Sequence, residues 1–376
     1  MPTLENLAVA LDERFDDGVR ATGAERIEAV GCALEERESL DDRTLAWIDL
    51  TFGGTWSREA FAAHNVVARR NGAPVGFASF AAHDMRFRWL RSMGAQQGVG
   101  IFGPFGIAEF ERGGNIAPAL LTLALCGLRR LGYATGLIAA VGDPRLAAYY
   151  VRECGARVVE RFNTDDWSEP KPRTVVMASG AGTNFAALAR AVADRALPIE
   201  LAAVVSSSDD AKVRERARGA GIAEHVIAWQ RQRETRAQYD ERLLERVRAL
   251  SPELLLLLGW MHLLDARFVA AFPAIVNLHP AFLPLDPRSD SVGMPDGTTI
   301  PVFRGPHAVR DAIRARSGWI GTSVHRVTEQ TDRGPIVMRA PLQLKPGEEE
   351  DSAYARLREI EHALVPRAVR SWCFER

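Results

Sequence analysis

Cysteine is scarce in this sequence: the 376 residues include four, and no two of them form a Cys-x-x-Cys pair. A zinc ribbon or a disulfide framework needs closely spaced cysteines, so neither is indicated, and we expect no metal site. The four residues are instead expected to be buried, free thiols in a reducing cytosol. They are Cys32, Cys126, Cys154 and Cys373.

Long hydrophobic runs are also missing. The longest apolar stretch, residues 254–258 continuing to Trp260, is far shorter than the ~20 residues that a membrane span needs. The first twelve residues show no basic segment followed by an apolar one, which a signal peptide would have. These two absences predict a cytoplasmic protein with no membrane partner.

Neither sign of charge is in excess. The chain has 47 lysines and arginines against 48 aspartates and glutamates, for a formal net charge of −1. Because nucleic acid and anionic membranes attract basic proteins, neither is an expected partner. The composition, 47% hydrophobic and 25% charged, is typical of a globular protein, and the length suits two domains.

A polar segment, residues 164–173, divides the chain. Pro170 and Pro172 restrict their neighbours to extended conformations, which is typical of a linker. An apolar strand begins directly afterwards, at Thr174. We therefore predict a first domain over residues 1–163, a linker over 164–173 and a second domain over 174–376.

In the second half, short apolar runs alternate with amphipathic stretches. This β-α-β rhythm is typical of an α/β fold with a doubly wound, Rossmann-like parallel sheet. The expected strands cover residues 174–178, 201–206, 225–228, 253–258 and 274–279, and the expected helices cover residues 184–197, 211–221 and 235–250.

The first half is predicted to be an α+β domain with a mixed sheet. Its strongest local signal is Asn71-Gly72, a dipeptide typical of tight hairpin turns. We expect helices over residues 4–15, 24–37, 116–131 and 144–153, and strands over residues 65–70, 73–81, 100–107, 135–141 and 157–162.

Asn277 and His279 stand at the predicted carboxyl end of a strand, where ligands of open α/β sheets bind. Residues two apart on a strand face the same side. An asparagine amide can hydrogen-bond a developing oxyanion, and a histidine can transfer a proton near neutral pH. Asp332 lies in a loop before an expected strand at 336–339; beside His279 it would raise the imidazole pKa and hold a water. On spacing alone, a strand-end cap and a surface histidine are the alternative interpretation.

Five ordered motifs resemble the folate-dependent formyltransferases, the family that includes glycinamide ribonucleotide (GAR) transformylase and methionyl-tRNA formyltransferase. Together they span residues 174–372. The motifs are Met177-Ala-Ser-Gly-Ala-Gly-Thr-Asn184, Leu258-Gly-Trp-Met-His-Leu-Leu264, Ile275-Val-Asn-Leu-His-Pro-Ala-Phe-Leu-Pro284, Phe303-Arg-Gly-Pro-His-Ala308, and Gly321-Thr-Ser-Val-His-Arg-Val-Thr328 with Asp332-Arg-Gly-Pro335. Glu361-His362 is similar to a substrate-binding region in the last helix of the family.

This resemblance implies an enzyme that transfers a formyl group from N10-formyltetrahydrofolate to a small-molecule primary amine, with GAR, a phosphorylated amine of purine biosynthesis, as the default acceptor. It implies that Asn277 and a protonated His279 stabilise the oxyanion, and that Asp332 keeps His279 charged and helps move the proton to the folate leaving nitrogen. His325, on the strand before Asp332, either orients this network or packs in the core. The resemblance assigns folate contacts to Met261, His262, Leu263 and Leu264. Substrate contacts go to the glycine-rich loop, whose amides suit a phosphate, and to the last helix: Gly180, Ala181, Gly182, Thr183, Asn184 and Glu361.

The sequence departs from the family pattern in two places. His262 stands where GAR transformylases typically have arginine, and residues 285–302 are an insertion in which Asp296-Gly297 predicts a hairpin. The insertion leaves another small amine or hydroxylamine metabolite open as the acceptor; a tolerated surface extension is the plainer interpretation. A nicotinamide-dependent reductase is disfavoured, because Gly180-Ala-Gly182 lacks the third glycine of that motif.

Residues 103–121 resemble the acetyl-CoA-binding turn of GNAT-type N-acetyltransferases, where amides at a helix N-terminus form a pyrophosphate site. Residues 143–156 resemble the closing segment of that family, in which a tyrosine often protonates the departing thiolate; Tyr149 and Tyr150 are the candidates. The first key glycine of the turn is replaced by asparagine here. The resemblance implies acetyl-CoA as a second cofactor, with contacts from Arg112, Gly113, Gly114, Asn115 and Ala117.

Two interpretations of the first domain stay open. It is a working acyltransferase that acylates or binds the substrate of the second domain, or a degenerate module for substrate binding or dimerisation, so a homodimer is also open. Glu109 and Glu111 are near enough to serve as its general base. A non-catalytic folate- or CoA-sensing protein is the remaining alternative, and the intact set of Asn277, His279 and Asp332 argues against it.

Overall fold

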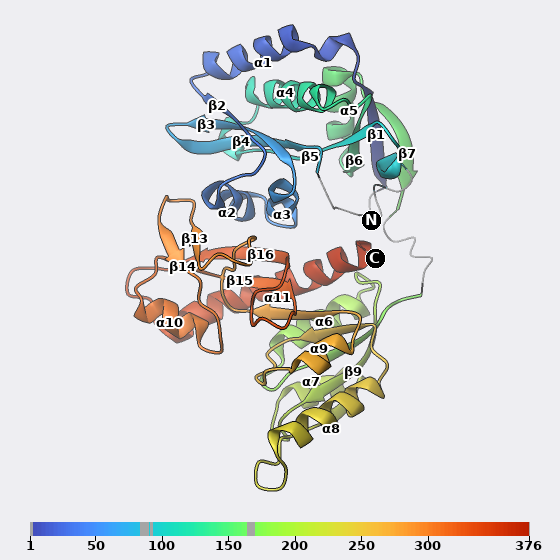
Figure 1. The fold of residues 1–376 in the computed structure, drawn as a ribbon, viewed down its shortest axis with the longest axis vertical. Coiled ribbons are helices and arrows are strands. Elements are labelled where there is room, and N and C mark those ends of the chain that lie inside the picture. The colour runs from blue at the N-terminus through green and yellow to red at the C-terminus, as the bar shows by residue number, and fades with distance from the viewer. Residues whose placement is uncertain (1–2, 83–89, 91–92, 164–169, 376) are drawn as a thin grey trace. The chain divides into compact units, whose positions relative to one another are not determined.

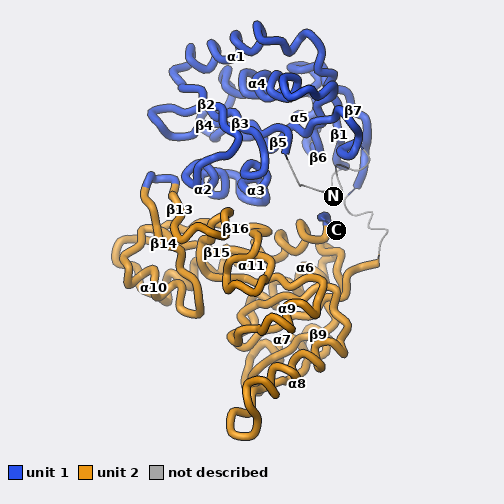
Figure 2. The backbone as a smooth tube through the Cα atoms, viewed as in Figure 1, with its two compact units in different colours: residues 1–168, 295–297, 374–376 blue, residues 169–294, 298–373 orange. Residues whose placement is uncertain are grey.

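The structure is a computed structural model that describes residues 3–82, 90, 93–163 and 170–375 (Figure 1). The chain divides into two compact units (Figure 2), one formed by Met1–Ser168 with Pro295–Gly297 and Phe374–Arg376, the other by Glu169–Met294 and Thr298–Cys373. Most of the expected linker, residues 164–169 of 164–173, lies outside the described residues. Among the helices that are described, none is long and apolar enough to cross a membrane.

The first unit is built on a mixed sheet, as expected. Over the described residues this sheet has seven strands in the order β2-β3-β4-β5-β6-β1-β7. The strands are β1 (Leu4–Ala10), β2 (Ala33–Arg37), β3 (His64–Arg70), β4 (Ala73–Phe80), β5 (Val99–Ile107), β6 (Thr135–Val141) and β7 (Arg157–Phe162). The helices are α1 (Asp17–Ala29), α2 (Asp42–Thr51), α3 (Trp56–Phe61), α4 (Ile116–Arg130) and α5 (Pro144–Cys154), with short 3-10 turns at Glu13–Phe15, Met93–Ala95 and Glu109–Glu111.

The one parallel pair in this described sheet, β5 and β6, separates along its length. The two strands pair from Val99↔Thr135 to Phe102↔Ile138. Beyond Phe102, β5 pairs with β4 on its other side. The strands therefore part toward their carboxyl ends, which is the end from which the chain continues into α4.

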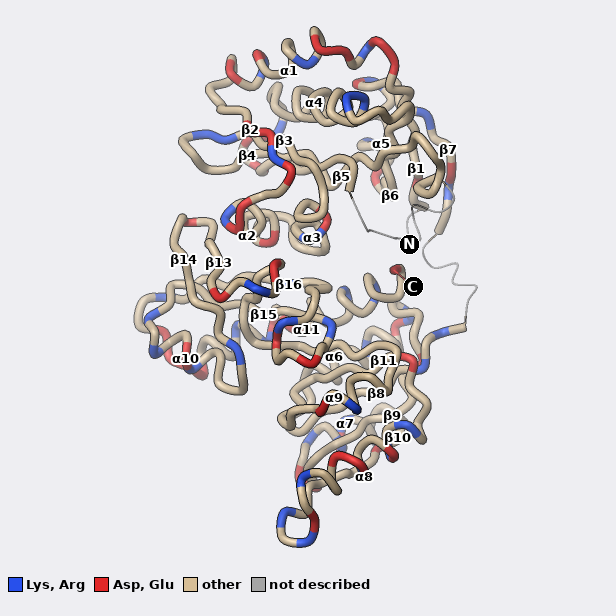
Figure 3. Tube along the Cα trace, in the orientation of Figure 1, with Lys and Arg blue, Asp and Glu red and all other residues tan. Residues whose placement is uncertain are grey.

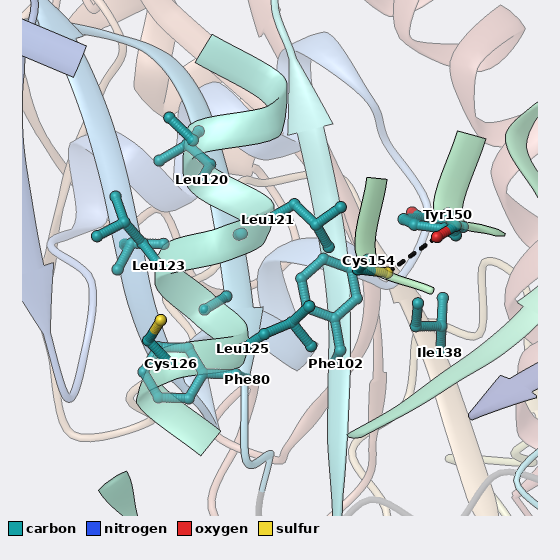
Figure 4. Packing of buried hydrophobic residues seen from close by; sticks show 14 of the residues in the cluster. Phe80, Phe102, Leu120, Leu121, Leu123, Leu125, Cys126, Ile138, Tyr150 and Cys154 are labelled. Atoms are coloured by element: carbon teal, nitrogen blue, oxygen red, sulfur yellow. Dashed lines mark hydrogen bonds between the residues drawn. The ribbon is translucent and has the colours of Figure 1, made fainter. Parts of the chain in front are cut away.

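The core of the first unit lies between the sheet and α4. Figure 4 shows Leu121 and Leu125 of α4 close to Phe102, with Ile138 and Tyr150 beside them, and all five belong to one buried cluster. The Cys154 thiol donates a hydrogen bond to the Tyr150 carbonyl at 3.0 Å. All four cysteines are buried and unpaired, which confirms that prediction.

Two predictions for the start of the chain were wrong. Residues 4–15 were expected to form a helix, but Leu4–Ala10 is the strand β1, hydrogen-bonded to β6 and β7 on its two sides. The apolar spacing there fits either period, so pairing with two neighbours decides the outcome. The helix expected over 24–37 runs instead over Asp17–Ala29 and ends before Gly31, whose positive φ of 72° breaks it.

The second unit contains a doubly wound sheet. Its described strands follow the order β10-β9-β8-β11-β12-β15-β16. They are β8 (Arg173–Met177), β9 (Glu200–Ser206), β10 (Ala223–Val226), β11 (Leu254–Leu257), β12 (Ile275–His279), β15 (Trp319–Arg326) and β16 (Ile336–Gln343), and a separate hairpin pairs β13 (Ser291–Gly293) with β14 (Thr299–Pro301). The helices are α6 (Thr183–Ala193), α7 (Val213–Gly219), α8 (Arg236–Arg248), α9 (Ala266–Ala270), α10 (Ala308–Arg314) and α11 (Glu350–Phe374).

The strands from β10 to β12 are parallel, which confirms the predicted Rossmann-like core. β15 and β16 are antiparallel and make the sheet mixed, which the prediction did not include. Local sequence explains several of these elements. β11 reads Leu-Leu-Leu-Leu and is buried throughout, as a central parallel strand should be. Thr235 and Gln238 form a reciprocal capping box that starts α8.

The hairpin expected at Asp296-Gly297 is present. β13 and β14 pair in register, and Gly297 has a φ of 86°, as a tight turn requires.

In the main sheet of the second unit, the strands β8, β9 and β10 follow one another outward to one edge, and β11 and β12 follow one another toward the other edge. The strand order thus reverses between β8 and β11, the point at which such sheets bind ligands.

Candidate active site

Asn277 and His279 lie at the carboxyl end of β12, where they were expected. The neighbouring strand β15 is antiparallel, and it places His325 opposite Asn277. The Asn277 Nδ2 atom lies 3.1 Å from His325 Nε2, and the ring's other nitrogen lies 2.9 Å from the Arg326 carbonyl. Because a carbonyl only accepts, Nδ1 carries the His325 proton, and in the neutral ring Nε2 accepts from the Asn277 amide.

Asp332 closes this arrangement from the loop between β15 and β16. Its carboxylate lies 3.6 Å from His279 Nδ1 and 3.5 Å from His325 Nε2. Its other support is the Gly305 amide, which donates to Oδ2 at 3.1 Å. Asp332 has a φ of 52°, a left-handed conformation that aspartate tolerates better than most residues. The structure therefore joins Asn277, His325, Asp332 and His279 into one polar chain.

Asp332 is ionised at any working pH. Burial alone would raise the pKa of this carboxyl, but its contacts with the His325 and His279 imidazoles and the hydrogen bond from the Gly305 amide outweigh burial and lower the pKa to about 2. A buried carboxylate held as an anion in this way stabilises positive charge that develops on a neighbouring imidazole.

The expectation that His279 is charged at rest was wrong. Asp332 raises the pKa of His279 as predicted, but burial lowers it more, and the net pKa is below the ordinary value. His279 is only 5% exposed, and its Nε2 lies 2.9 Å from the Phe303 carbonyl. The neutral ring therefore donates through Nε2 and presents the lone pair of Nδ1 toward Asp332.

The glycine-rich loop joins β8 to α6 near the point where the strand order reverses. Gly182 is the N-cap of α6 with a φ of 71°, and a Cβ atom there would lie 2.6 Å from Val213 Cβ, so only glycine fits. Asn184 Nδ2 donates to Glu361 Oε2 at 2.8 Å. This bond joins two of the expected substrate residues, although Asn184 Oδ1 is buried with no partner among the described residues.

Glu361 is a buried acid. It is 5% exposed, and burial raises its pKa although the hydrogen bond from Asn184 and the contact with the Thr322 hydroxyl oppose the shift. Thr322 also links this acid to the first group of residues, because its hydroxyl donates to the His279 carbonyl at 3.3 Å. Gly180 and Ala181 lie in the same loop and Thr183 begins α6; the Gly180 carbonyl accepts from the Val213 amide at 3.1 Å and the Ala181 carbonyl from Arg216 Nε at 2.8 Å.

The expected folate segment follows β11. Met261 is 59% exposed and Leu263 is 67% exposed, which is unusual for large apolar side chains that neighbour each other. Between them, His262 sits among the rings of Trp229, Tyr239 and Trp260, at centroid distances of 6.3, 5.5 and 5.6 Å. Burial, and then the charges of Arg236 and Arg231, lower the pKa of His262.

The candidate residues of the first unit lie where α4 begins. Arg112, Gly113, Gly114 and Asn115 are exposed, Ala117 is partly buried, and Gly113 has a φ of 85°. Tyr150 is buried in the core, and the hydroxyl of Tyr149 is buried with no partner among the described residues. Glu111 is a poor candidate for a base, because its hydrogen bonds with Arg70, at 2.6 and 3.0 Å, lower its pKa.

Several contacts of the site were not predicted from the sequence. The carbonyl of Phe303 and the amide of Gly305 bind His279 and Asp332 through the backbone, which leaves no signal in residue type. His325 was noticed only as a residue that orients the network or packs in the core. Its position opposite Asn277 could have been found by aligning β12 and β15 as an antiparallel pair.

The fold and this polar chain define a formyltransferase, and comparison with known proteins gives the same class. Residues 172–287 and 297–369 match the family described as Formyl transferase, which is about half of the chain. The chain belongs to this family. The match leaves out residues 288–296, the part of the insertion that includes the turn of the hairpin.

Several individual relatives are phosphoribosylglycinamide formyltransferases. The chain is 33% identical to the phosphoribosylglycinamide formyltransferase of Escherichia coli over 199 residues. The aligned region covers 53% of this chain and 85% of that protein. The Bacillus subtilis enzyme of the same name is 28% identical over 196 residues, which cover 52% of this chain and 91% of that protein. Among solved structures, the Brucella melitensis enzyme has 32% identity, a TM-score of 0.46 and coverage of 54% and 95%.

Proposed function

We propose that the second unit transfers the formyl group of N10-formyltetrahydrofolate to a small primary amine, by the chemistry of Asn277, His279 and Asp332. The observation that carries this proposal is the chain of contacts from Asn277 through His325 to Asp332 and His279 at the carboxyl end of β12. Each member has a separate task in the reaction.

His279 is the proton acceptor. It is neutral at rest, so its Nδ1 lone pair is free to take a proton from the attacking amine. The resulting imidazolium would be stabilised by the Asp332 anion on one side and the Phe303 carbonyl on the other. Its proton would then pass to the folate nitrogen that leaves as the bond between that nitrogen and the formyl carbon breaks. The 3.6 Å separation from Asp332 is too long for a direct hydrogen bond and suits a shared water.

Asn277 is the oxyanion donor. Its amide has two N–H groups, and His325 Nε2 accepts only one of them. The second is available to hydrogen-bond the oxygen of the formyl group as negative charge develops there. The bond to His325 fixes the amide orientation beforehand, so no reorganisation is needed when the charge forms.

The residues after β11 fit a folate. Met261 and Leu263 offer an exposed apolar surface after the strand that pairs with β12, which suits a flat heterocycle. An open hollow lined by Trp229–Arg233 shares Trp229 with the ring group around His262, and Arg231 stands 4.6 Å over the Trp229 ring. Folate carries carboxylates, and arginines at this hollow would compensate for the arginine that position 262 lacks. Bound there, N10-formyltetrahydrofolate supplies the formyl group.

GAR is the default acceptor, since the loop at Gly180–Asn184 opens a helix and suits a phosphate. The relatives are named for the same phosphoribosyl substrate. Positive and negative side chains are interspersed along both units (Figure 3), which favours a small molecule over a tRNA. The insertion beside the site favours the second candidate, another small amine or hydroxylamine.

A formyl-transfer assay with purified full-length protein distinguishes these acceptors. Tetrahydrofolate release is followed with GAR and with a panel of small amines and hydroxylamines. Rapid turnover of GAR would end the specialised-substrate alternative, whereas turnover of a panel member alone would establish it. Undiminished transfer to every amine by a His279→Ala variant would overturn the role proposed for His279.

For the first unit we propose binding of an acyl thioester of the acetyl-CoA type. The observation in favour is the separation of the parallel strands β5 and β6 beyond Phe102, at the end where exposed Arg112–Asn115 precede α4. Amides at the start of a helix attract a pyrophosphate. Calorimetric titration with acetyl-CoA tests this, with Gly113→Asp as the variant that should abolish binding. Absence of heat with the natural chain would favour a degenerate module, and sedimentation would then test dimerisation.

A further inference from the structure

The insertion between β12 and α10 is tied to the active site by two arginines. Arg304 follows the hairpin, and Arg333 directly follows Asp332 in sequence. Both guanidiniums converge on one oxygen of Asp290, with Nη1 of Arg304 at 2.7 Å and Nη2 of Arg333 at 2.6 Å from Oδ1. A single carboxylate thus bridges two cations that would otherwise repel each other.

Each arginine also donates a hydrogen bond to the backbone of the insertion. Arg304 Nη2 donates to the Ser289 carbonyl at 2.8 Å, and Arg333 Nη1 donates to the Pro287 carbonyl at 2.9 Å. Their side chains are 17% and 29% exposed and the Asp290 side chain is 72% exposed, so the arginine ends of the network are better shielded from water than its carboxylate. An exposed single ion pair adds little, but several charge-assisted bonds in one network hold a geometry.

Asp290 itself is held in place. Its carbonyl accepts the Val302 amide at 3.0 Å, a bond that closes the base of the β13–β14 hairpin. The next residues along the chain are Phe303 and Gly305, whose backbone binds His279 at 2.9 Å and Asp332 at 3.1 Å. The base of the insertion and the contacts of the reacting groups are therefore parts of one continuous segment.

We propose that Asp290 is a positioning residue: through Arg304 and Arg333 it fixes the loop that carries Asp332 against His279. Arg304 Nε also lies 3.4 Å from the Asp332 carbonyl, so Arg304 contacts Asp332 directly, and Arg333 is its neighbour in the sequence. Asp290 lies among residues 288–296, which the family match leaves out. The insertion is then a working part of this active site rather than a surface extension. The proposal rests on the role proposed above for Asp332.

The test measures geometry and activity separately. The amide of Gly305 is bonded to Asp332, so its hydrogen–deuterium exchange, followed by mass spectrometry of peptides that contain it, reports whether the loop is in place. In Asp290→Asn we expect this exchange to be about tenfold faster, the loss expected for a charge-assisted hydrogen bond. We expect kcat for formyl transfer to fall roughly tenfold with KM for the amine unchanged.

Matched variants make the outcome decisive. Asp286→Asn removes another ion pair of the same insertion, with Arg288, that does not reach the loop, and it should leave both measurements unchanged. Asp290→Glu should restore most of both, and Arg333→Gln should reproduce the defect. Unaltered Gly305 exchange in Asp290→Asn overturns the proposal, and so does equal acceleration in peptides of β11, which would mean global loosening. If the natural chain transferred no formyl group, the proposed function would be wrong, but the exchange of the Gly305 amide would still test whether Asp290 positions the loop.

Discussion

His279 Nδ1 and the Asp332 carboxylate lie 3.6 Å apart, with both side chains less than a tenth exposed. Asp332 raises the pKa of His279 against a stronger effect of burial, so the imidazole is neutral and still coupled to an anion. This pairing suits a base that must be free at rest and charged during the reaction.

Replacing Asp332 with asparagine should change the pH profile of formyl transfer. His279 acts as a base, so activity in the natural enzyme should rise with pH through a midpoint below 6.5, the ordinary pKa of histidine. Removing the anion removes the effect that raises this pKa, so the midpoint should move to lower pH. The plateau should fall by about 100-fold, because the imidazolium loses its partner. A midpoint shifted upward in kcat/KM profiles would contradict this assignment.

Asn277→Asp should abolish most of the activity although it preserves the shape of the side chain. The carboxylate has no N–H to offer the developing oxyanion and would repel it. We expect kcat to fall by about 100- to 1000-fold with a small change in KM for the amine. Steady-state kinetics test this, and circular dichroism serves as the folding control. Activity near that of the natural chain would show that the oxyanion is stabilised elsewhere.

Gly334→Ala should damage the catalytic loop. A Cβ atom at position 334 would lie 1.7 Å from the carbonyl oxygen of Arg326, which is backbone and cannot move aside. The same carbonyl accepts the His325 hydrogen bond, so the clash also reaches the polar chain. We expect a loss of about 1–3 kcal/mol in the free energy of unfolding, together with most of the activity.

Gly318→Ala is the matched control for that variant. Gly318 lies in the turn before β15, and a Cβ atom there would meet no heavy atom within 4 Å. Denaturant unfolding and formyl transfer should both match the natural chain. If the two alanine variants were equally stable, the tight packing of Gly334 on Arg326 would not be a requirement of the fold.

The sequence predicted the parallel core of the second unit because its central strands are rich in apolar residues. β11, with four consecutive leucines, fits no other place than the middle of a covered sheet. β1 was mistaken for a helix because Leu4, Leu7 and Leu11 recur at the helical spacing of three and four residues, although the buried Leu7, Val9 and Leu11 also alternate as on a strand. Only its pairing with β6 and β7, more than 120 residues away in sequence, removes the ambiguity.

The site was predicted unevenly for a similar reason. The positions of Asn277 and His279 follow from strand geometry, which a sequence carries. The protonation of His279 depends on burial by neighbours from other segments, so the expected sign of its pKa shift was wrong. Asp290 pairs with Arg304 and Arg333, which are 14 and 43 residues away in the sequence, and no local pattern marks such a pairing.

Glu361→Gln should separate stability from function. Burial raises the pKa of Glu361, so an ionised carboxylate there is costly to the folded state. A raised folded pKa means that the penalty is absent below the unfolded pKa, near 4.5, and grows as the pH rises above it. The Glu361→Gln variant should therefore melt at a higher temperature than the natural chain at pH 7, and the difference should vanish at pH 4.

The same substitution should weaken substrate binding if Glu361 accepts a hydrogen bond from the acceptor. Asn184 can still donate to the new amide carbonyl, so the loop before α6 should keep its geometry. We expect KM for the amine to rise about tenfold with kcat nearly unchanged, since the lost bond is one to a charged group. Glu359→Gln, an exposed position on the same helix, is the control and should alter neither quantity. A higher melting temperature with an unchanged KM would mean that the acid is kept for a purpose other than holding the acceptor.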